Sequence, residues 1–358
     1  MTSTPARRPE GPAYLRLYER LRREIVGGSY PFGSRMPSKR QLAEEEGVSV
    51  ITAEHAYALL CDEGYLEARE RSGYYVTFRE TDGFVPAESV PVPRRAEPRP
   101  GPVTDVPLRA LGRIMRRVIA EHGDSLLERC PNPGREELRG AISRYLARSR
   151  GIHVTPEQIW IGAGAEYLYG LIVQALGPDR LYAAEDPSFE KIARVYRAHG
   201  AECVLLPLGR DGIRSDALAG TEASVLHITP YRSYPSDVTA SPAKRREYVR
   251  WADREDRFVV EDDYASEFTA ASRPAETVFS LSERGRVIYM NTFSRTIAPS
   301  LRIGYLVLSE ELLPLFTERV GFYACPVPVP EQLFLAEFIE SGEFERSIRR
   351  ARRKLRRQ

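Results

Sequence analysis

From Asp105 onward, short apolar runs alternate with amphipathic segments, and this alternation limits the possible fold more than any other feature of the chain. The intervening amphipathic segments include Glu137–Arg148, Glu190–His199 and Pro242–Asp256. Strands that alternate with helices form a mostly parallel sheet covered by helices, so residues 105–358 are predicted to be an α/β domain. The apolar runs have the length and composition of buried strands: Gln158–Ile161, Arg180–Ala183, Cys203–Leu206, Val225–Ile228, Phe258–Glu261, Val287–Met290 and Ile303–Leu308.

The part of the chain before this domain divides into two regions. Residues 1–77 are helix-rich and end in a predicted hairpin. Residues 78–104 are rich in proline and charge and have little apolar periodicity, which is typical of an extended linker.

Bulk features exclude several classes of protein. The chain has no apolar stretch long enough to span a membrane, and its first residues lack the apolar core of a signal peptide, so we expect a cytoplasmic protein. The cysteines are scattered without any metal-ligand spacing, so we expect small buried hydrophobic side chains and no metal site: Cys61, Cys130, Cys203 and Cys325.

Residues 1–77 carry the signals of a helix-turn-helix. Ser38 and Gln41 are spaced as a capping box at the start of a short helix that Gly47 ends. Ser49 then caps the next helix. Two helices joined by a tight glycine-containing turn are the helix-turn-helix arrangement. An earlier helix has one apolar face: Tyr14, Leu17, Tyr18, Leu21 and Ile25.

A hairpin after Gly64 completes a winged form of this motif. Tyr65–Ala68 and Tyr74–Val76 are predicted strands, with Arg69–Gly73 at the tip between them. Residues 1–76 contain 11 basic and 11 acidic side chains and so have no net charge. Support for DNA binding therefore comes from the order of the caps, turn and wing, and not from overall charge.

The segment MPSKRQLAEEEGVSVITAEHAYALLCDEGYLEARERSGYYV resembles the GntR family of bacterial regulators, and the resemblance covers residues 13–76. It implies binding to a double-stranded DNA operator. The third helix, from Ser49, would enter the major groove, where Thr52 and His55 either contact DNA or form ordinary solvated surface. Val50 can contact a thymine methyl but cannot bind guanine. The remaining implied contacts are to phosphate, from Ser38 and Arg40, and to the minor groove, from Arg69, Arg71, Ser72 and Gly73.

Motifs in the second region follow the predicted strands. The glycine-rich turn Ile161–Tyr167 opens a helix, an arrangement that suits phosphate because free amides point at the anion. EDPSF, residues 185–189, places Phe189 where it can stack on a planar ring. The other motifs are ITPYRSYP at 228–235, VVEDDY at 259–264 and NTFSRTIAPSLRIGY at 291–305.

This ordered series resembles the large domain of fold-type-I aminotransferases, which use pyridoxal 5'-phosphate (PLP). Joined to a GntR-type head, it is similar to the MocR subgroup of regulators. The resemblance implies that Asp262 pairs with the pyridinium nitrogen and Tyr264 with the ring hydroxyl, while Phe189 lies against the ring. The phosphate would be held by Gly164, Ala165, Ser294 and Arg302.

The chain departs from the family pattern at Arg295, which stands where the resemblance places the Schiff-base lysine. A guanidinium stays protonated and is no amine nucleophile, so we predict no catalytic residue and only non-covalent PLP, if any. Lys191, after EDPSF, is either a substitute near the ring or a solvated helix residue. Asp237 replaces a common glycine, and residues up to Gln358 do not include the family's small C-terminal domain with its carboxylate-binding arginine, so we expect this chain to function without it.

Three functional hypotheses remain. The chain is a homodimeric transcription regulator whose second domain senses an amino acid or a B6 vitamer, or one whose second domain only dimerises, or a PLP-dependent aminotransferase. Arg295 and the missing small domain argue against the enzyme. The basic tail Arg346–Gln358 is either a nucleic-acid patch or, as we favour, a family helix.

Overall fold

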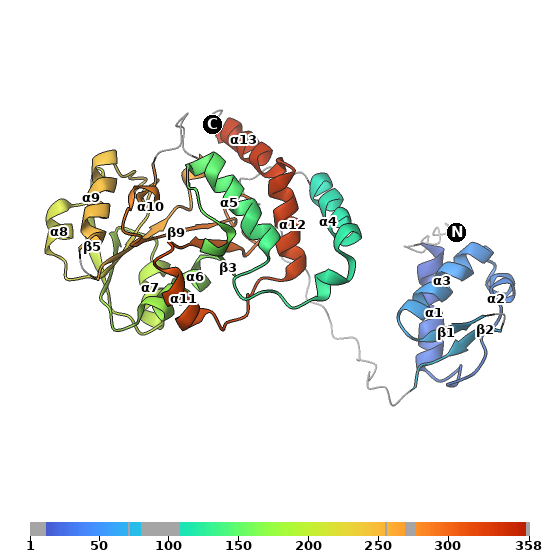
Figure 1. Cartoon of the computed structure of the whole chain (residues 1–358). Coiled ribbons are helices and arrows are strands. Elements are labelled where there is room, and N and C mark those ends of the chain that lie inside the picture. The colour runs from blue at the N-terminus through green and yellow to red at the C-terminus, as the bar shows by residue number, and fades with distance from the viewer. Residues whose placement is uncertain (1–11, 71, 80–107, 255, 269–275, 356–358) are drawn as a thin grey trace, which may run out of the picture. The chain divides into compact units, whose positions relative to one another are not determined.

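The computed structural model describes residues 12–70, 72–79, 108–254, 256–268 and 276–355. The chain divides into two compact units, Met1–Glu97 and Pro98–Gln358 (Figure 1). Most of the predicted linker 78–104 lies outside the described residues, so it stays a prediction. Among the described residues, no helix is long and apolar enough to cross a membrane.

The N-terminal unit is a winged helix-turn-helix. Its strands pair antiparallel from Leu66↔Val76 to Arg69↔Gly73, so the first strand begins and ends one residue later than predicted. Its core is formed by one face of each helix and by the inner ends of the strands, including Leu21, Tyr57 and Leu60. The elements are α1 (Ala13–Val26), α2 (Lys39–Glu46), α3 (Val50–Asp62), β1 (Leu66–Arg69) and β2 (Gly73–Val76).

Serine caps position the two helices of the motif. The Ser38 hydroxyl accepts a hydrogen bond from the Gln41 amide at 3.2 Å, which is the first half of the predicted capping box. The Ser49 hydroxyl accepts from the Thr52 amide at 3.1 Å. Gly47 ends α2 in the left-handed conformation, with a φ of 63°, which glycine adopts at little cost. Short local signals therefore fix both helix starts.

The C-terminal unit is built on an eight-stranded sheet in the order β3-β10-β9-β8-β7-β4-β5-β6. The central pairs β9·β8, β8·β7, β7·β4 and β4·β5 are parallel, whereas β10 runs antiparallel to both its neighbours and β6 antiparallel to β5. The predicted α/β class with a mostly parallel sheet is thus confirmed. The strands are β3 (Ile159–Gly162), β4 (Tyr182–Asp186), β5 (Cys203–Gly209), β6 (Gly212–Ile213), β7 (Val225–Ile228), β8 (Phe258–Asp262), β9 (Val287–Thr292) and β10 (Gly304–Val307).

Helices cover both faces of this sheet (Figure 1). Neighbouring strand residues point to opposite faces: Val259 packs with one layer and Val260 with the other. One layer contains α6 (Ala165–Leu176), α7 (Lys191–Ala198) and α11 (Leu313–Val320). The other contains α4 (Leu108–His122), α5 (Glu136–Arg150), α8 (Ser215–Gly220), α9 (Pro242–Ala252), α10 (Val278–Leu281), α12 (Val329–Glu340) and α13 (Glu343–Leu355).

Two helix predictions need comment. The helix predicted to reach Asp256 ends at Ala252, and Asp256 itself has a φ of 58°, a left-handed conformation that no helix residue adopts. The basic tail forms α13, which buries Phe344, Ile348 and Ala351 against the unit. This agrees with the preferred interpretation of the tail as a helix.

Candidate functional site

A cavity of about 340 Å³ lies at the carboxyl ends of the parallel strands β4, β7, β8 and β9, beside the start of α6. Open α/β sheets bind ligands at this edge because the loops that follow parallel strands meet there. The cavity is lined by Ala165, Tyr169, Phe189, Ile192, Thr229, Tyr234, Asp262, Tyr264, Thr292, Ser294 and Arg295. Sequence reasoning had named Ala165, Phe189, Asp262, Tyr264 and Ser294 for the cofactor and Arg295 for the lysine position.

Asp262, the last residue of β8, is buried and presents one free carboxylate oxygen. Its Oδ2 accepts a hydrogen bond from the Tyr169 hydroxyl at 2.6 Å, but its Oδ1 is buried without a hydrogen-bond partner. Burial raises the pKa of Tyr169 well above its usual value, and the nearby Asp262 carboxylate raises it further, so this phenol remains a donor. A buried polar atom without a partner is costly. The open Oδ1 therefore favours a ligand that donates an N–H to Asp262.

Two further buried side chains, His227 and Tyr196, lie next to Asp262 on the side away from the cavity. His227 Nε2 lies 3.6 Å from Asp262 Oδ2 and has no hydrogen-bond partner, while the Tyr196 hydroxyl lies 2.6 Å from His227 Nδ1. These side chains are all almost inaccessible to solvent. They fix the position of the carboxylate and exclude water from its inner side.

Aromatic side chains form the walls of the cavity. Phe189 is 41% exposed, and its ring centroid lies 6.4 Å from that of Tyr234. The Tyr264 hydroxyl, expected to meet a ring hydroxyl, donates to the Arg232 carbonyl at 2.8 Å. Such walls suit a flat ring better than a flexible chain.

The start of α6 provides a place for an anion at one end of the cavity. Gly164 is the N-cap of α6 with a φ of 89°, and the first turn that follows it has amides without helical partners. Arg302 lies across Gly164, where an added Cβ would come within 2.9 Å of its Nη2. Arg302 binds Glu166, and Ser294 donates to the Leu301 carbonyl at 3.2 Å. Gly164 and Arg302 thus adjoin the cavity without lining it.

The cavity has a cation but no amine. Arg295 lines it and stacks over the Tyr264 ring at 5.1 Å, and among the described residues it forms no ion pair. The Lys191 side chain is exposed, and its Nζ forms an ion pair with Glu166 Oε1 at 2.6 Å. Lys244 is buried elsewhere and donates to the Ile213 carbonyl at 2.7 Å. Within the described ranges, no lysine lines the cavity.

The predicted DNA-contacting residues all belong to the N-terminal unit, but they differ in their exposure and in their contacts within the unit. Ser38, Arg40, Ser49 and Arg69 are exposed. The Thr52 hydroxyl lies 2.9 Å from Ser49 Oγ. The remaining predictions fall on His55, an exposed residue whose ring packs edge-on against Tyr14 at 5.7 Å, on Ser72 and Gly73 at the wing, and on Arg71, which lies outside the described residues.

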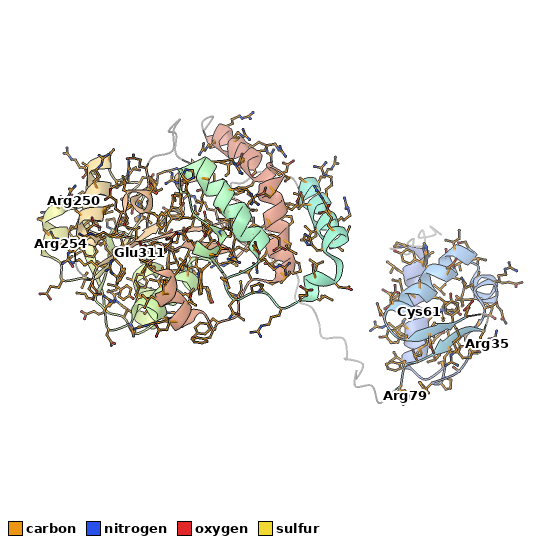
Figure 2. The ribbon with its side chains drawn as sticks, in the orientation of Figure 1. Arg35, Cys61, Arg79, Arg250, Arg254 and Glu311 are labelled. Atoms are coloured by element: carbon orange, nitrogen blue, oxygen red, sulfur yellow. The ribbon has the colours of Figure 1, made fainter. Side chains whose placement is uncertain are left out.

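Sequence reasoning missed one basic residue beside the wing. Arg35, labelled in Figure 2, is exposed, and its backbone forms an isolated β-bridge with Tyr75. Its guanidinium would lie 3.3 Å from a Cβ added at Gly73. It also missed Ile51, which with Val50 forms an exposed apolar pair at the start of α3, 66% and 43% exposed. In the cavity it missed Tyr169, Thr229 and Tyr234.

Both units match models of known families. Residues 13–76 match the model of bacterial regulatory proteins of the gntR family, and residues 102–358 match that of aminotransferase class I and II. The "Probable rhizopine catabolism regulatory protein MocR" of Rhizobium meliloti is 30% identical over 367 residues, which cover 96% of this chain and 74% of that protein. The chain belongs to the MocR group of GntR-family transcription regulators.

Other relatives of this MocR-type regulator agree with that assignment. The "HTH-type pyridoxine biosynthesis transcriptional regulator PdxR" of Corynebacterium glutamicum is 28% identical, with 94% of this chain and 75% of that protein covered. Among solved structures, an archaeal alanine:glyoxylate aminotransferase shares the fold with a TM-score of 0.62 and 24% identity. The alignment covers 68% of this chain and 62% of that enzyme. The MocR-type chain is therefore an HTH-type regulator that carries an aminotransferase-like domain and binds DNA through its GntR-type head.

Proposed function

We propose that the C-terminal unit of this regulator binds a phosphorylated B6 vitamer without a covalent bond, and that this binding changes its affinity for operator DNA. The observation that carries the proposal is the buried Asp262, whose free Oδ1 belongs to a side chain lining a cavity with aromatic walls. A pyridine nitrogen that carries a proton would satisfy that oxygen. The aminotransferase class I and II match supports the choice of ligand class.

The residues that surround the cavity fit PLP in kind. Phe189 and Tyr264 would hold the ring, and Ala165, Ser294 and the amides at the start of α6 would hold the phosphate. Arg302 would join them by exchanging its Glu166 partner for phosphate. When bound, PLP supplies a protonated ring nitrogen and an anionic phosphate, and its aldehyde is the group that a lysine would capture.

Arg295 would make the complex non-covalent, because a guanidinium keeps its proton and is no amine nucleophile. Its side chain lines the cavity, where it keeps a positive charge and can bind an anionic group of the ligand. The described residues that line the cavity can hold and orient the ligand and exclude water from it. None of them is an amine base. These properties suit a sensor better than a transaminase.

We further propose that the active form is a homodimer on an operator with two half-sites. Exposed apolar side chains of the C-terminal unit, including Leu127 at 88% and Phe322 at 68%, support a surface that a second copy covers. The printed name of the relative PdxR, a pyridoxine biosynthesis regulator, supports a B6 vitamer as effector. Light scattering of the purified chain measures the oligomeric state.

Binding and linkage can be tested separately. We expect PLP to bind the chain, as followed by quenching of protein fluorescence, and to leave no mass increase after borohydride reduction. Pyridoxamine 5'-phosphate, which has no aldehyde, should bind as well. The Arg295→Lys variant should gain the mass of one reduced cofactor, which would place residue 295 next to the aldehyde. A borohydride-stable adduct on the wild-type chain, or no binding of either vitamer, would overturn the proposal.

A further inference from the structure

Two of the cysteines lie together at one buried amide. Cys130 is in the loop before α5, and Cys325 is in the loop before α12. Gln332 Nε2 lies 3.1 Å from Cys130 Sγ and 3.5 Å from Cys325 Sγ, so a single amide nitrogen is within hydrogen-bonding distance of both sulfur atoms. Both are free and half-buried. The fold thus brings two thiols that are far apart in the sequence to the same side-chain amide.

Gln332 holds both loops in place. Its side chain is completely buried, its Oε1 accepts from the Arg135 amide at 2.8 Å and its Nε2 donates to the Val327 carbonyl at 2.7 Å. Cys325 Sγ also lies 3.7 Å from the Ile161 carbonyl of β3. The two loops that carry the thiols are therefore held to each other and to β3 through Gln332 and Cys325.

We propose that Cys130 and Cys325 are an oxidation site, at which a peroxide converts the two thiols to an intramolecular disulfide. The thiolate of Cys130 attacks one peroxide oxygen, so that an S–O bond forms, the O–O bond breaks and the other oxygen leaves as water or an alcohol. The sulfur of Cys325 then attacks that of Cys130 and loses its proton, and water leaves. The two thiols supply the two electrons that reduce the peroxide.

The order of the two steps follows from the surroundings of the thiols. Burial is the main cause that raises the pKa of Cys325 to about 12, which disfavours a thiolate on Cys325. Cys130 therefore reacts with the peroxide and Cys325 resolves the product. The other cysteines are placed differently: Cys203 is buried in the sheet, and Cys61 lies on α3 in the N-terminal unit (Figure 2).

The disulfide would join the loops before α5 and α12 next to β3, which leads directly into the turn at Gly162 and Gly164 beside the cavity. A cross-link over so long a stretch of chain restricts the unfolded state strongly. We expect the oxidised C-terminal unit to unfold about 5 °C higher than the reduced one.

The experiment uses the full reduced chain, treated with one equivalent of hydrogen peroxide and then with a maleimide, and digested without reductant. We expect a cross-linked peptide pair that contains Cys130 and Cys325, loss of two of the four free thiols, and unchanged monomer mobility without reductant. Dithiothreitol should reverse both the cross-link and the thermal shift. Cys61→Ser, which removes a half-buried thiol of the other unit, should keep the cross-link, and Cys130→Ser should lose it.

Several results would overturn the proposal: four thiols still free, a sulfinic acid on Cys130 without a cross-link, or a disulfide between two chains. The peptide map of the wild-type chain decides between them even if a variant fails to fold. Because the cysteines do not line the cavity, the outcome is independent of whether PLP binds.

Discussion

The N-terminal unit carries its functional groups on the surface, whereas the C-terminal unit carries its own at the edge of a buried sheet. Arg35, Arg40 and Arg69 are all exposed side chains that solvent and salt reach freely. Asp262, by contrast, is 3% exposed, and its Oδ1 has no hydrogen-bond partner among the described residues. Under the proposed function, the two units would therefore recognise ligands by different physics: many weak, salt-sensitive contacts in one, and a few costly buried groups in the other.

The largest expected effect belongs to the buried site. Asp262→Asn should lower the affinity for PLP about 30-fold, because a neutral amide replaces the carboxylate that we propose to pair with the protonated ring nitrogen. Its carbonyl can still accept from Tyr169, so the empty unit should keep its fold. Fluorescence titration measures the change. Asp216→Asn, which alters an exposed ion pair with Arg214, is the control, and equal losses in both variants would contradict the assignment.

A smaller and salt-dependent effect is expected on the head. Arg40→Ala should weaken binding to all DNA sequences and lower the slope of log K against log salt by about 1, since one phosphate contact is lost. Arg250 is a matched exposed arginine on α9 of the C-terminal unit (Figure 2), and Arg250→Ala should leave the slope unchanged. Anisotropy titrations at several salt concentrations would show it. If Arg40→Ala leaves the slope of log K against log salt unchanged, the assignment of Arg40 to a phosphate contact is contradicted.

The pH dependence of stability should come from the C-terminal unit. Burial, with help from the nearby Asp263 carboxylate, raises the pKa of Glu267 to about 7. Since this folded-state pKa lies above the unfolded value, Glu267 stabilises the fold most at acid pH, and that stability is lost as the pH rises through about 7. Glu267→Gln stays neutral, and its Oε1 can still accept from Asn291.

We therefore expect Glu267→Gln to gain stability relative to wild type between about pH 5 and about pH 8, on the order of 1 kcal/mol. Denaturant unfolding at both pH values measures the difference. Burial also raises the pKa of Glu261 to about 7, so part of the wild-type dependence should remain. A difference between variant and wild type that stays constant with pH would show that Glu267 titrates normally in the folded chain.

The smallest effect tests a local signal. Ser49→Ala removes the N-cap bond of α3 and should destabilise the N-terminal unit by about 1 kcal/mol. Ser29→Ala changes an exposed serine outside the helices and should have little effect. Chemical unfolding measures both. If the two variants unfold alike, the cap contributes nothing to the stability of the head.

The units also differ in what the sequence reveals. Ser38 and Ser49 accept from amides a few residues away, and Gly47 ends α2 through its own backbone conformation, so their roles could be predicted from local sequence alone. Asp262 was assigned from the resemblance of its motif VVEDDY to aminotransferases, and in the structure it ends a buried strand whose neighbours are parallel. The serine caps thus needed only a local pattern, whereas Asp262 needed a family resemblance.

The residues that were missed depend on contacts between distant segments. Arg35 reaches the wing only because its backbone pairs with Tyr75. Tyr169 faces Asp262 only after α6 packs on the sheet, and no local pattern distinguishes it from other core tyrosines. The shared position of Cys130 and Cys325 at Gln332 likewise arises from the packing of two loops around this side chain.

The central claim is that the buried site controls the exposed one. It is tested most directly by the affinity of the full chain for a DNA fragment from the intergenic region upstream of its own gene, measured with and without saturating PLP. We expect PLP to change that affinity at least about 5-fold in the wild type and to have no effect at the same concentration in Asp262→Asn. A change below about 2-fold in the wild type, equivalent to about 0.5 kcal/mol, would show that the two units are not coupled.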